Sequence, residues 1–132
     1  MNILLDTHML LWAAKGTLPE RARTMATDPG NELFFSVASI WEIVIKVGLG
    51  RPDFTVDGGV LRRELLEHRY RELPVLGQHV LMLQSIPPLH RDPFDRLLVA
   101  QANSEGLLLV TSDRILQNYP GSILFIPARQ SM

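Results

Sequence analysis

The sequence predicts an α/β domain in which helices cover both faces of a central, mostly parallel sheet. Three observations support this fold class. Short apolar runs recur along the 132 residues, segments of helical character follow them, and turn signals such as "DPGN" and "GLGRP" separate the elements. Strands that alternate with helices are typical of a parallel sheet with helices on its faces. We therefore expect three layers, α/β/α, around a sheet of four to five strands.

The first quarter of the chain contains two expected strands and two expected helices. Asn2 to Leu5 is a short apolar run, which predicts a buried strand. Thr7 to Lys15 has helical character, and Gly16 ends it. A second helix is expected from Pro19 to Thr27, before the "DPGN" turn, and a second strand at Glu32 to Phe35.

The next segment is expected to form two helices joined by a loop. Either Ser36 or Ser39 caps a helix that runs to about Val47, where "GLGRP" ends it. Residues 51–60 contain two glycines and are expected to form a loop. Residues 61–71, rich in arginine and glutamate, are expected to form a solvated amphipathic helix, with an RNA-facing or partner-facing surface as the alternative.

The second half of the chain continues the alternation. "LLLVTSD" is the clearest buried strand in the sequence, because it is short, apolar and bounded by Gly106 and an aspartate. "IPPLH" is expected to be an extended linker. Short strands are expected at 72–75, 107–113 and 122–127, and helices or helical turns at 78–85, 92–105 and 114–118.

The composition sets the class of protein. A length of 132 residues suits one compact domain, so we expect a single domain over residues 1–132. There is no cysteine, which excludes disulfides, thiolate metal sites and thiol nucleophiles and is consistent with a reducing cytoplasm. The N-terminus lacks the basic region of a signal peptide, and no stretch approaches the ~20 apolar residues of a membrane span. We therefore expect a cytoplasmic protein with no membrane partner.

Two aspartates follow predicted strands, and a glutamate lies in a predicted helix. Asp6 and Asp113 each end a strand, where an aspartate is also a favoured helix N-cap. Glu42 is part of a capping box if its helix starts at Ser39, and lies mid-helix among apolar residues if the helix starts earlier. In the second case a buried carboxylate needs a partner, and Lys46, four residues on, is the simplest one.

The stretch "HRDPFDRLLVAQA" contains two further acids with different expected roles. Asp92 before Pro93 has the features of a helix cap, since aspartate is favoured at the N-cap and proline at the first helical position. Asp95 then lies in the first turn, where it would complement the helix dipole. Because one capping acid already suffices, Asp95 is the better candidate for chemistry.

Taken together, four acids are expected to converge at one edge of the sheet. Ligands of parallel α/β sheets gather outside the carboxyl ends of the strands, and clustered carboxylates repel one another unless a cation is present. Oxygen ligands without cysteine suit Mg²⁺ or Mn²⁺ rather than zinc. Such an ion can activate water and hold a phosphate oxygen. The four candidate catalytic and metal-binding residues are Asp6, Glu42, Asp95 and Asp113.

The ordered motifs "LLDTH", "SIWEI", "DPFDRLLVAQA" and "LLLVTSD" resemble those of PIN domains, and most closely the VapC-type toxins of bacterial type II toxin–antitoxin pairs. The resemblance covers essentially the whole chain. It implies a metal-dependent endoribonuclease, a homodimer and a small cognate antitoxin. Carried over onto this sequence, it assigns the four acids to the metal site and Thr7, Thr111 and Ser112 to its support.

Arginines and histidines near the acids have open roles. Arg96 and Arg114 follow two of the acids directly, so they are candidates for contacts with RNA phosphates, and local ion pairs with the same acids are an equal alternative. For Arg91 a local ion pair is the better interpretation. His8 and His90 are candidates for proton transfer, although histidines at such positions more often cap helices or line the rim of the core.

Two other functions remain open at this point. A phosphatase or phosphoryl-transfer domain on a doubly wound sheet would need a second acid two residues after Asp6, where this sequence has His8. A catalytically silent binding module would use the acids only as helix caps. It predicts that the acids need not meet and that no divalent metal binds.

Overall fold

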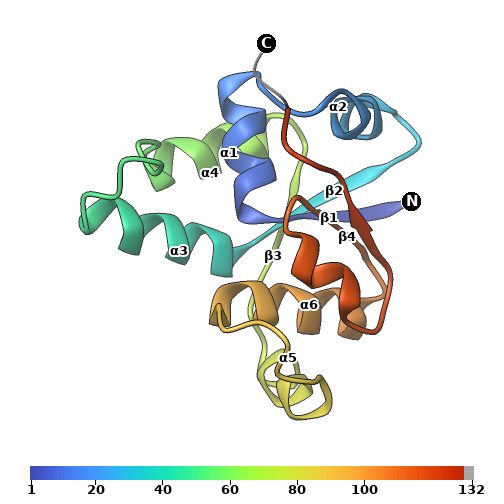
Figure 1. Cartoon of the computed structure of the whole chain (residues 1–132). Coiled ribbons are helices and arrows are strands. Elements are labelled where there is room, and N and C mark those ends of the chain that lie inside the picture. Colours follow the sequence, from blue (N-terminus) through green and yellow to red (C-terminus); the bar gives the residue numbers. More distant parts are fainter. Residues whose placement is uncertain (130–132) are drawn as a thin grey trace.

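A computed structural model describes residues 1–129 of the chain. Its centre is a five-stranded sheet with the order β3-β2-β1-β4-β5, and all four neighbouring pairs of strands are parallel. The N-terminal strand therefore lies in the middle of the sheet (Figure 1). The expected α/β class is confirmed, and the sheet is fully parallel. The strands are β1 Asn2–Leu5, β2 Glu32–Ser36, β3 Arg71–Leu73, β4 Leu108–Thr111 and β5 Ile123–Phe125.

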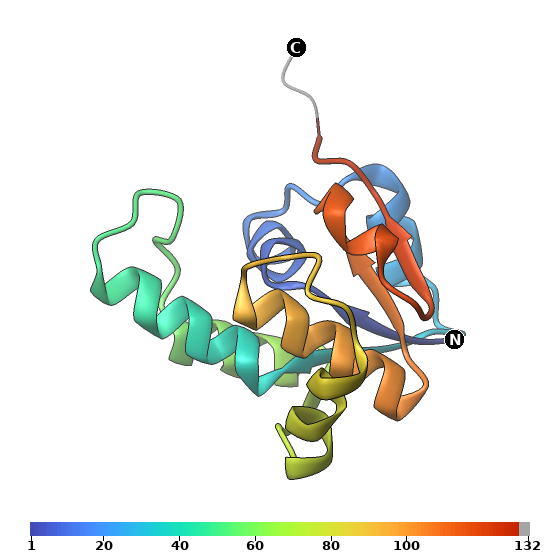
Figure 2. The same ribbon diagram turned by 60° about the horizontal axis from the view of Figure 1, so that its bottom comes forward.

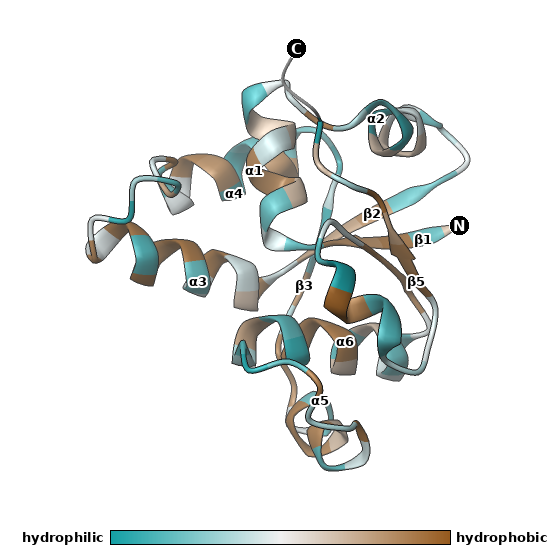
Figure 3. Cartoon of the chain, in the orientation of Figure 1, coloured by the Kyte–Doolittle hydropathy of each residue, from teal (hydrophilic) through white to brown (hydrophobic). Residues whose placement is uncertain are grey.

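Helices lie on both faces of the sheet because the side chains of each strand alternate between the two faces. In β1, Ile3 and Leu5 belong to one core with helices α1, α2 and α4, whereas Leu4 belongs to a second core with α6. The strands at the centre are almost entirely apolar (Figure 3). The helices are α1 Thr7–Lys15, α2 Glu20–Thr27, α3 Val37–Gly48, α4 Gly58–Glu67, α5 Gly77–Met82 and α6 Pro93–Glu105, with short 3-10 turns η1 Leu83–Ser85 and η2 Arg114–Asn118.

Most helix ends are fixed by the residues expected to fix them. Gly16 and Gly106 end α1 and α6 in the left-handed conformation, with φ of 71° and 68°. Only glycine adopts this conformation without a steric cost. Ser36 rather than Ser39 caps α3, since its hydroxyl accepts a hydrogen bond from the backbone N–H of Ala38. Glu42 is therefore a mid-helix residue.

One helix was placed incorrectly from the sequence. Residues 61–71 were expected to be helical after a loop over 51–60, but α4 starts at Gly58 and ends at Glu67. The Asp57 side chain caps it by accepting a hydrogen bond from the backbone N–H of Val60. Arg71 instead belongs to β3, where it pairs with Phe34. Because the two glycines after Asp57 are weak helix formers, the sequence did not indicate that the helix begins there.

Helices α3 and α6 run beside each other, and α5 packs against α6 (Figure 2). Among the described residues, none of the helices is both long and apolar enough to cross a membrane.

Candidate metal site at the carboxyl edge of the sheet

Asp6 is held in place by bonds to both of its carboxylate oxygens. It follows β1 and caps α1, so that Oδ1 accepts a hydrogen bond from the backbone N–H of Met9 at 2.9 Å. The hydroxyl of Thr111, the last residue of β4, donates to Oδ2 at 2.7 Å. Only 3% of Asp6 is exposed. Burial raises its pKa, and the bonds from Thr111 and from the backbone of Met9 and Ser112 oppose that rise.

Glu42 enters the site from the buried face of α3. The Thr7 hydroxyl donates to its Oε1 at 2.6 Å and also lies 2.9 Å from the Ser39 hydroxyl. The Lys46 ammonium pairs with its Oε2 at 2.6 Å. Glu42 is 2% exposed, so both of its partners are needed to offset the cost of burying the charge. The spacing of Glu42 and Lys46 had suggested this pair, but not the bond to Thr7.

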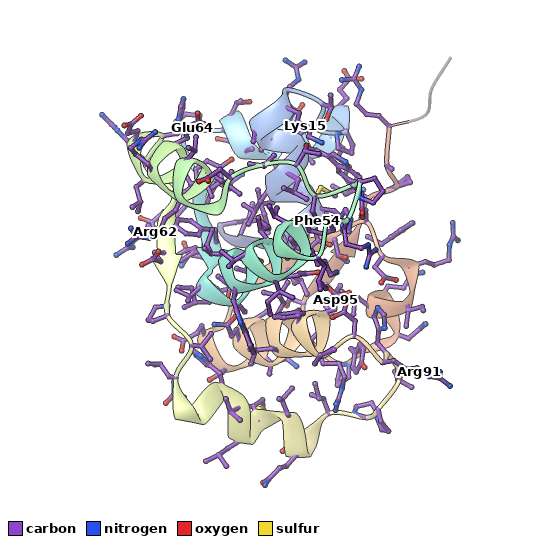
Figure 4. The ribbon with its side chains drawn as sticks, turned by 90° about the vertical axis from the view of Figure 1, so that its left-hand side faces the viewer. Lys15, Phe54, Arg62, Glu64, Arg91 and Asp95 are labelled. Carbon is purple, nitrogen blue, oxygen red and sulfur yellow. The ribbon has the colours of Figure 1, made fainter. Side chains whose placement is uncertain are left out.

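Asp95 and Asp113 approach from two different segments. Asp92 caps α6 by accepting bonds from the backbone N–H groups of Phe94 and Asp95, and this directs the Asp95 side chain inward. Figure 4 shows Asp95 on the inner side of α6, whereas Arg91 points away from the body of the chain. Asp113 follows β4 and accepts a bond from the backbone N–H of Ile115 at 2.9 Å.

Electrostatics show that the acids share one environment. Burial, followed by the negative charges of Asp92, Asp6, Glu42 and Asp113, raises the pKa of Asp95 to about 8. A carboxyl group with this pKa is largely protonated at neutral pH. A cation bound among these acids would remove that cost, because it replaces repulsion between carboxylates with attraction.

His90 is the residue of this site whose position the sequence did not reveal. Its Nε2 lies 2.7 Å from Oδ2 of Asp113 and 3.2 Å from Oδ2 of Asp95. The three side chains offer ligand atoms that all lie within 4.8 Å of one another. The extended "IPPLH" linker, which returns the chain to the carboxyl edge of the sheet, places it there. The sequence had given His90 only as a candidate for proton transfer, two residues before the cap Asp92.

The other predicted residues are placed as follows. Thr111 also accepts a bond from the backbone N–H of Asp113 at 3.0 Å, so it links two acids. Within residues 1–129, no ion pair involves Arg91, Arg96 or Arg114. The Nε of Arg96 is buried without a hydrogen-bond partner there, and Arg114 lies over the ring of Phe125 at 5.1 Å.

A cavity of about 470 Å³ lies between α1, α2 and α4, and none of the four acids lines it. Its walls are mostly apolar, with Arg23, Glu64, His68 and Tyr70 as the charged or titratable groups. The four acids are instead grouped at the ends of β1 and β4 and on α3 and α6, at the carboxyl edge of the sheet.

Comparisons with known proteins place this fold and site in a family. Residues 3–122 match the family model of the PIN domain, and the chain therefore belongs to the PIN-domain family. Among curated proteins, none gives a significant match.

Solved structures of the same fold include toxin–antitoxin complexes. A chain of VapBC2 from Rickettsia felis, bound to a DNA fragment from the promoter, has a TM-score of 0.69 and 15% identity, over 96% of this chain and 99% of that one. A chain of DNA-bound VapBC from Salmonella typhimurium has a TM-score of 0.66 and 18% identity, over 95% of this chain and 98% of that one. A chain of VapBC-5 from Mycobacterium tuberculosis has a TM-score of 0.61 and 17% identity, over 96% of this chain and 98% of that one. At these identities the likeness shows the fold alone, and this is the fold that the motifs had suggested.

Proposed function

We propose that this PIN domain is a Mg²⁺- or Mn²⁺-dependent endoribonuclease and that it is the toxin of a toxin–antitoxin pair in the cytoplasm. The observation that carries the proposal is the convergence of Asp6, Glu42, Asp95 and Asp113, whose charges, together with burial as the larger cause and with the charge of Asp92, raise the pKa of Asp95 to about 8. So many carboxylates in one partly buried place are costly unless a cation joins them.

The donor set fits a hard divalent cation. Asp95 and Asp113 each have an oxygen that is not bonded to the backbone, and both oxygens approach His90 Nε2. Each carboxylate oxygen of Asp6 and Glu42 already has one partner, from Thr111, Met9, Thr7 and Lys46, so we infer that these two acids reach the cation through a remaining lone pair or through water. When bound, the cation would supply a Lewis acid and lower the pKa of a water ligand.

This chain's own residues would orient the substrate and the acids. Thr111 and Thr7 hold Asp6 and Glu42 in fixed rotamers, which preorganises the negative charge of the site. We propose that Arg96 and Arg114 contact RNA phosphates, because neither is used in an ion pair among residues 1–129. Their guanidinium groups suit a phosphate backbone that lies along the carboxyl edge of the sheet.

The partners are proposed on separate grounds. A small antitoxin is supported by the solved VapBC complexes that share this fold. A homodimer is supported by α3, whose outer face exposes Val37, Trp41 and Val44 at a helical spacing. Trp41 is 57% exposed in the single chain, so we expect it to be covered when two copies associate. Light scattering on the wild type and on Trp41→Glu would test this interface.

The two alternatives fit the site less well. An aspartyl-phosphate mechanism needs Asp6 as a free nucleophile, but both of its oxygens accept hydrogen bonds and His8 stands where the second acid belongs. A silent binding module predicts acids that act only as helix caps. Glu42 and Asp95 cap no helix, and their charges act on one another.

The proposal is tested by RNA cleavage with EDTA, with Mg²⁺ and with Mn²⁺. We expect the wild type to cleave RNA only when metal is present. Asp95→Asn should reduce the rate by at least about 100-fold. Asp53→Asn is the matched control, because Asp53 is exposed and, among residues 1–129, its one ion pair is with Arg51. Cleavage that persists in EDTA, or an Asp95→Asn variant as active as the control, would reject the metal-site assignment.

A further inference from the structure

His90 makes the shortest connection between Asp95 and Asp113, the two acids that reach the site from α6 and from the end of β4. Its Nε2 is 2.7 Å from Oδ2 of Asp113 and 3.2 Å from Oδ2 of Asp95. The His90 side chain is 17% exposed, so water competes little for these bonds. One ring nitrogen therefore joins two acids that would otherwise repel each other.

The hydrogen bond made by Nδ1 of His90 determines whether Nε2 carries a hydrogen or a free lone pair. Nδ1 of His90 accepts a hydrogen bond from the backbone N–H of Asp92 at 3.3 Å. A nitrogen that accepts carries no hydrogen, so the hydrogen of a neutral imidazole lies on Nε2. Nε2–H can then donate to the carboxylates but has no lone pair for a metal ion. The backbone thus favours a donor role for His90 over direct ligation.

Hydrogen bonds also fix the backbone on either side of the His90 imidazole. The buried Tyr119, at the end of η2, accepts a hydrogen bond from the His90 backbone N–H on its hydroxyl at 2.8 Å. Asp92, two residues later, is fixed as the cap of α6. The backbone of His90 is therefore tied to the segment after β4 through Tyr119, and its imidazole is tied to the start of α6 through the backbone of Asp92.

We propose that His90 is a positioning residue, which holds Asp95 and Asp113 at the separation that a divalent cation needs. This inference rests on the proposed metal site. The Nε2 distances of 2.7 and 3.2 Å keep the two carboxylate oxygens close together before metal arrives. A site that is already assembled loses less conformational freedom when it binds, and groups that orient metal ligands typically contribute 10–100-fold to affinity.

The test measures Mn²⁺ affinity by isothermal titration calorimetry on the whole chain, at one pH and without RNA. His90→Phe keeps a ring and removes both nitrogens, whereas His90→Gln keeps an N–H donor at about the same reach. His68→Phe is the matched control, because His68 is exposed, its Nδ1 lies 2.8 Å from the Glu64 carbonyl oxygen, and it does not belong to the cluster of His90, Asp95 and Asp113. We expect His90→Phe to weaken Mn²⁺ binding by about 10–100-fold and His90→Gln to restore most of it.

A spectroscopic measurement separates positioning from ligation. Electron spin echo spectroscopy of bound Mn²⁺ detects directly coordinated nitrogen, and we expect no such coupling in the wild type. A nitrogen coupling that disappears in His90→Gln would overturn the proposal, and so would equal affinity of His90→Phe and the wild type. If the wild type itself binds no Mn²⁺, the metal site fails and the role of His90 fails with it. Thermal melts of each variant identify any that does not fold, and His90→Gln then carries the comparison.

Discussion

Replacing Asp95 with asparagine should stabilise the metal-free protein, and the gain should grow with pH. The pKa of Asp95 rises from 3.8 to about 8 on folding, mainly through burial and then through the charges of the neighbouring acids. The folded state therefore binds a proton that the unfolded state has already lost between pH 4 and 8. In that range the group lowers the stability of the wild type as pH rises, and the loss is complete above pH 8.

The size of the effect follows from the shift. One pKa unit corresponds to about 1.4 kcal/mol, so a rise of about four units sets an upper limit of about 6 kcal/mol above pH 8. The Asp95 side chain is 16% exposed, and solvent reduces the effect, so we expect about 2–4 kcal/mol. At about 4 °C for each kcal/mol, the melting temperature should rise by about 8–16 °C.

The assay is urea or thermal unfolding of both proteins in EDTA, from pH 5 to pH 9. The difference between the two stabilities should be smallest at pH 5 and should grow steadily up to about pH 8. Added Mn²⁺ should then stabilise the wild type and leave Asp95→Asn almost unchanged, because a ligand stabilises only the state that binds it. A difference that is constant across this pH range, or an asparagine variant that is less stable at pH 8, would refute the electrostatic reasoning.

Three further substitutions probe single contacts by urea unfolding. Lys46→Met removes the ammonium from the buried Glu42 and should cost about 1–3 kcal/mol; an unchanged midpoint would mean that Thr7 alone satisfies the carboxylate. Thr111→Val removes the hydroxyl that donates to Asp6 and accepts from the backbone N–H of Asp113, and it should cost about 1–2 kcal/mol; a stabilised variant would show that these bonds are not formed. Asp92→Ala removes the cap of α6, which should cost about 1 kcal/mol, and also removes a negative charge that raises the pKa of Asp95, which offsets part of that cost. A loss well above about 1 kcal/mol would mean that Asp92 makes a further stabilising contact.

The sequence predicted the order of elements well, because the signals involved are local. β1 and β4 are short apolar runs, and Gly16 and Gly106 mark helix ends by a conformation that other residues rarely adopt. The start of α4 was predicted too late because Gly58 and Gly59 are poor helix formers. The side chain of Asp57, which caps the helix, determines where α4 begins.

The candidate site could be predicted only in part. Asp6 and Asp113 follow neighbouring strands, so the sheet alone brings them to one edge. The contacts of Glu42 with Thr7 and of His90 with Asp113 depend on how α3 and the linker before α6 pack. These pairs are 35 and 23 residues apart, and no local pattern in the sequence encodes such contacts.

The account depends most on a divalent cation among the four acids. Anomalous diffraction from crystals soaked in Mn²⁺ would locate such an ion directly. We expect one or more peaks at about 2.1 Å from carboxylate oxygens of Asp95 and Asp113, with Asp6 and Glu42 within reach directly or through water. A map without a peak at this edge, or with Mn²⁺ bound only elsewhere, would contradict the central claim.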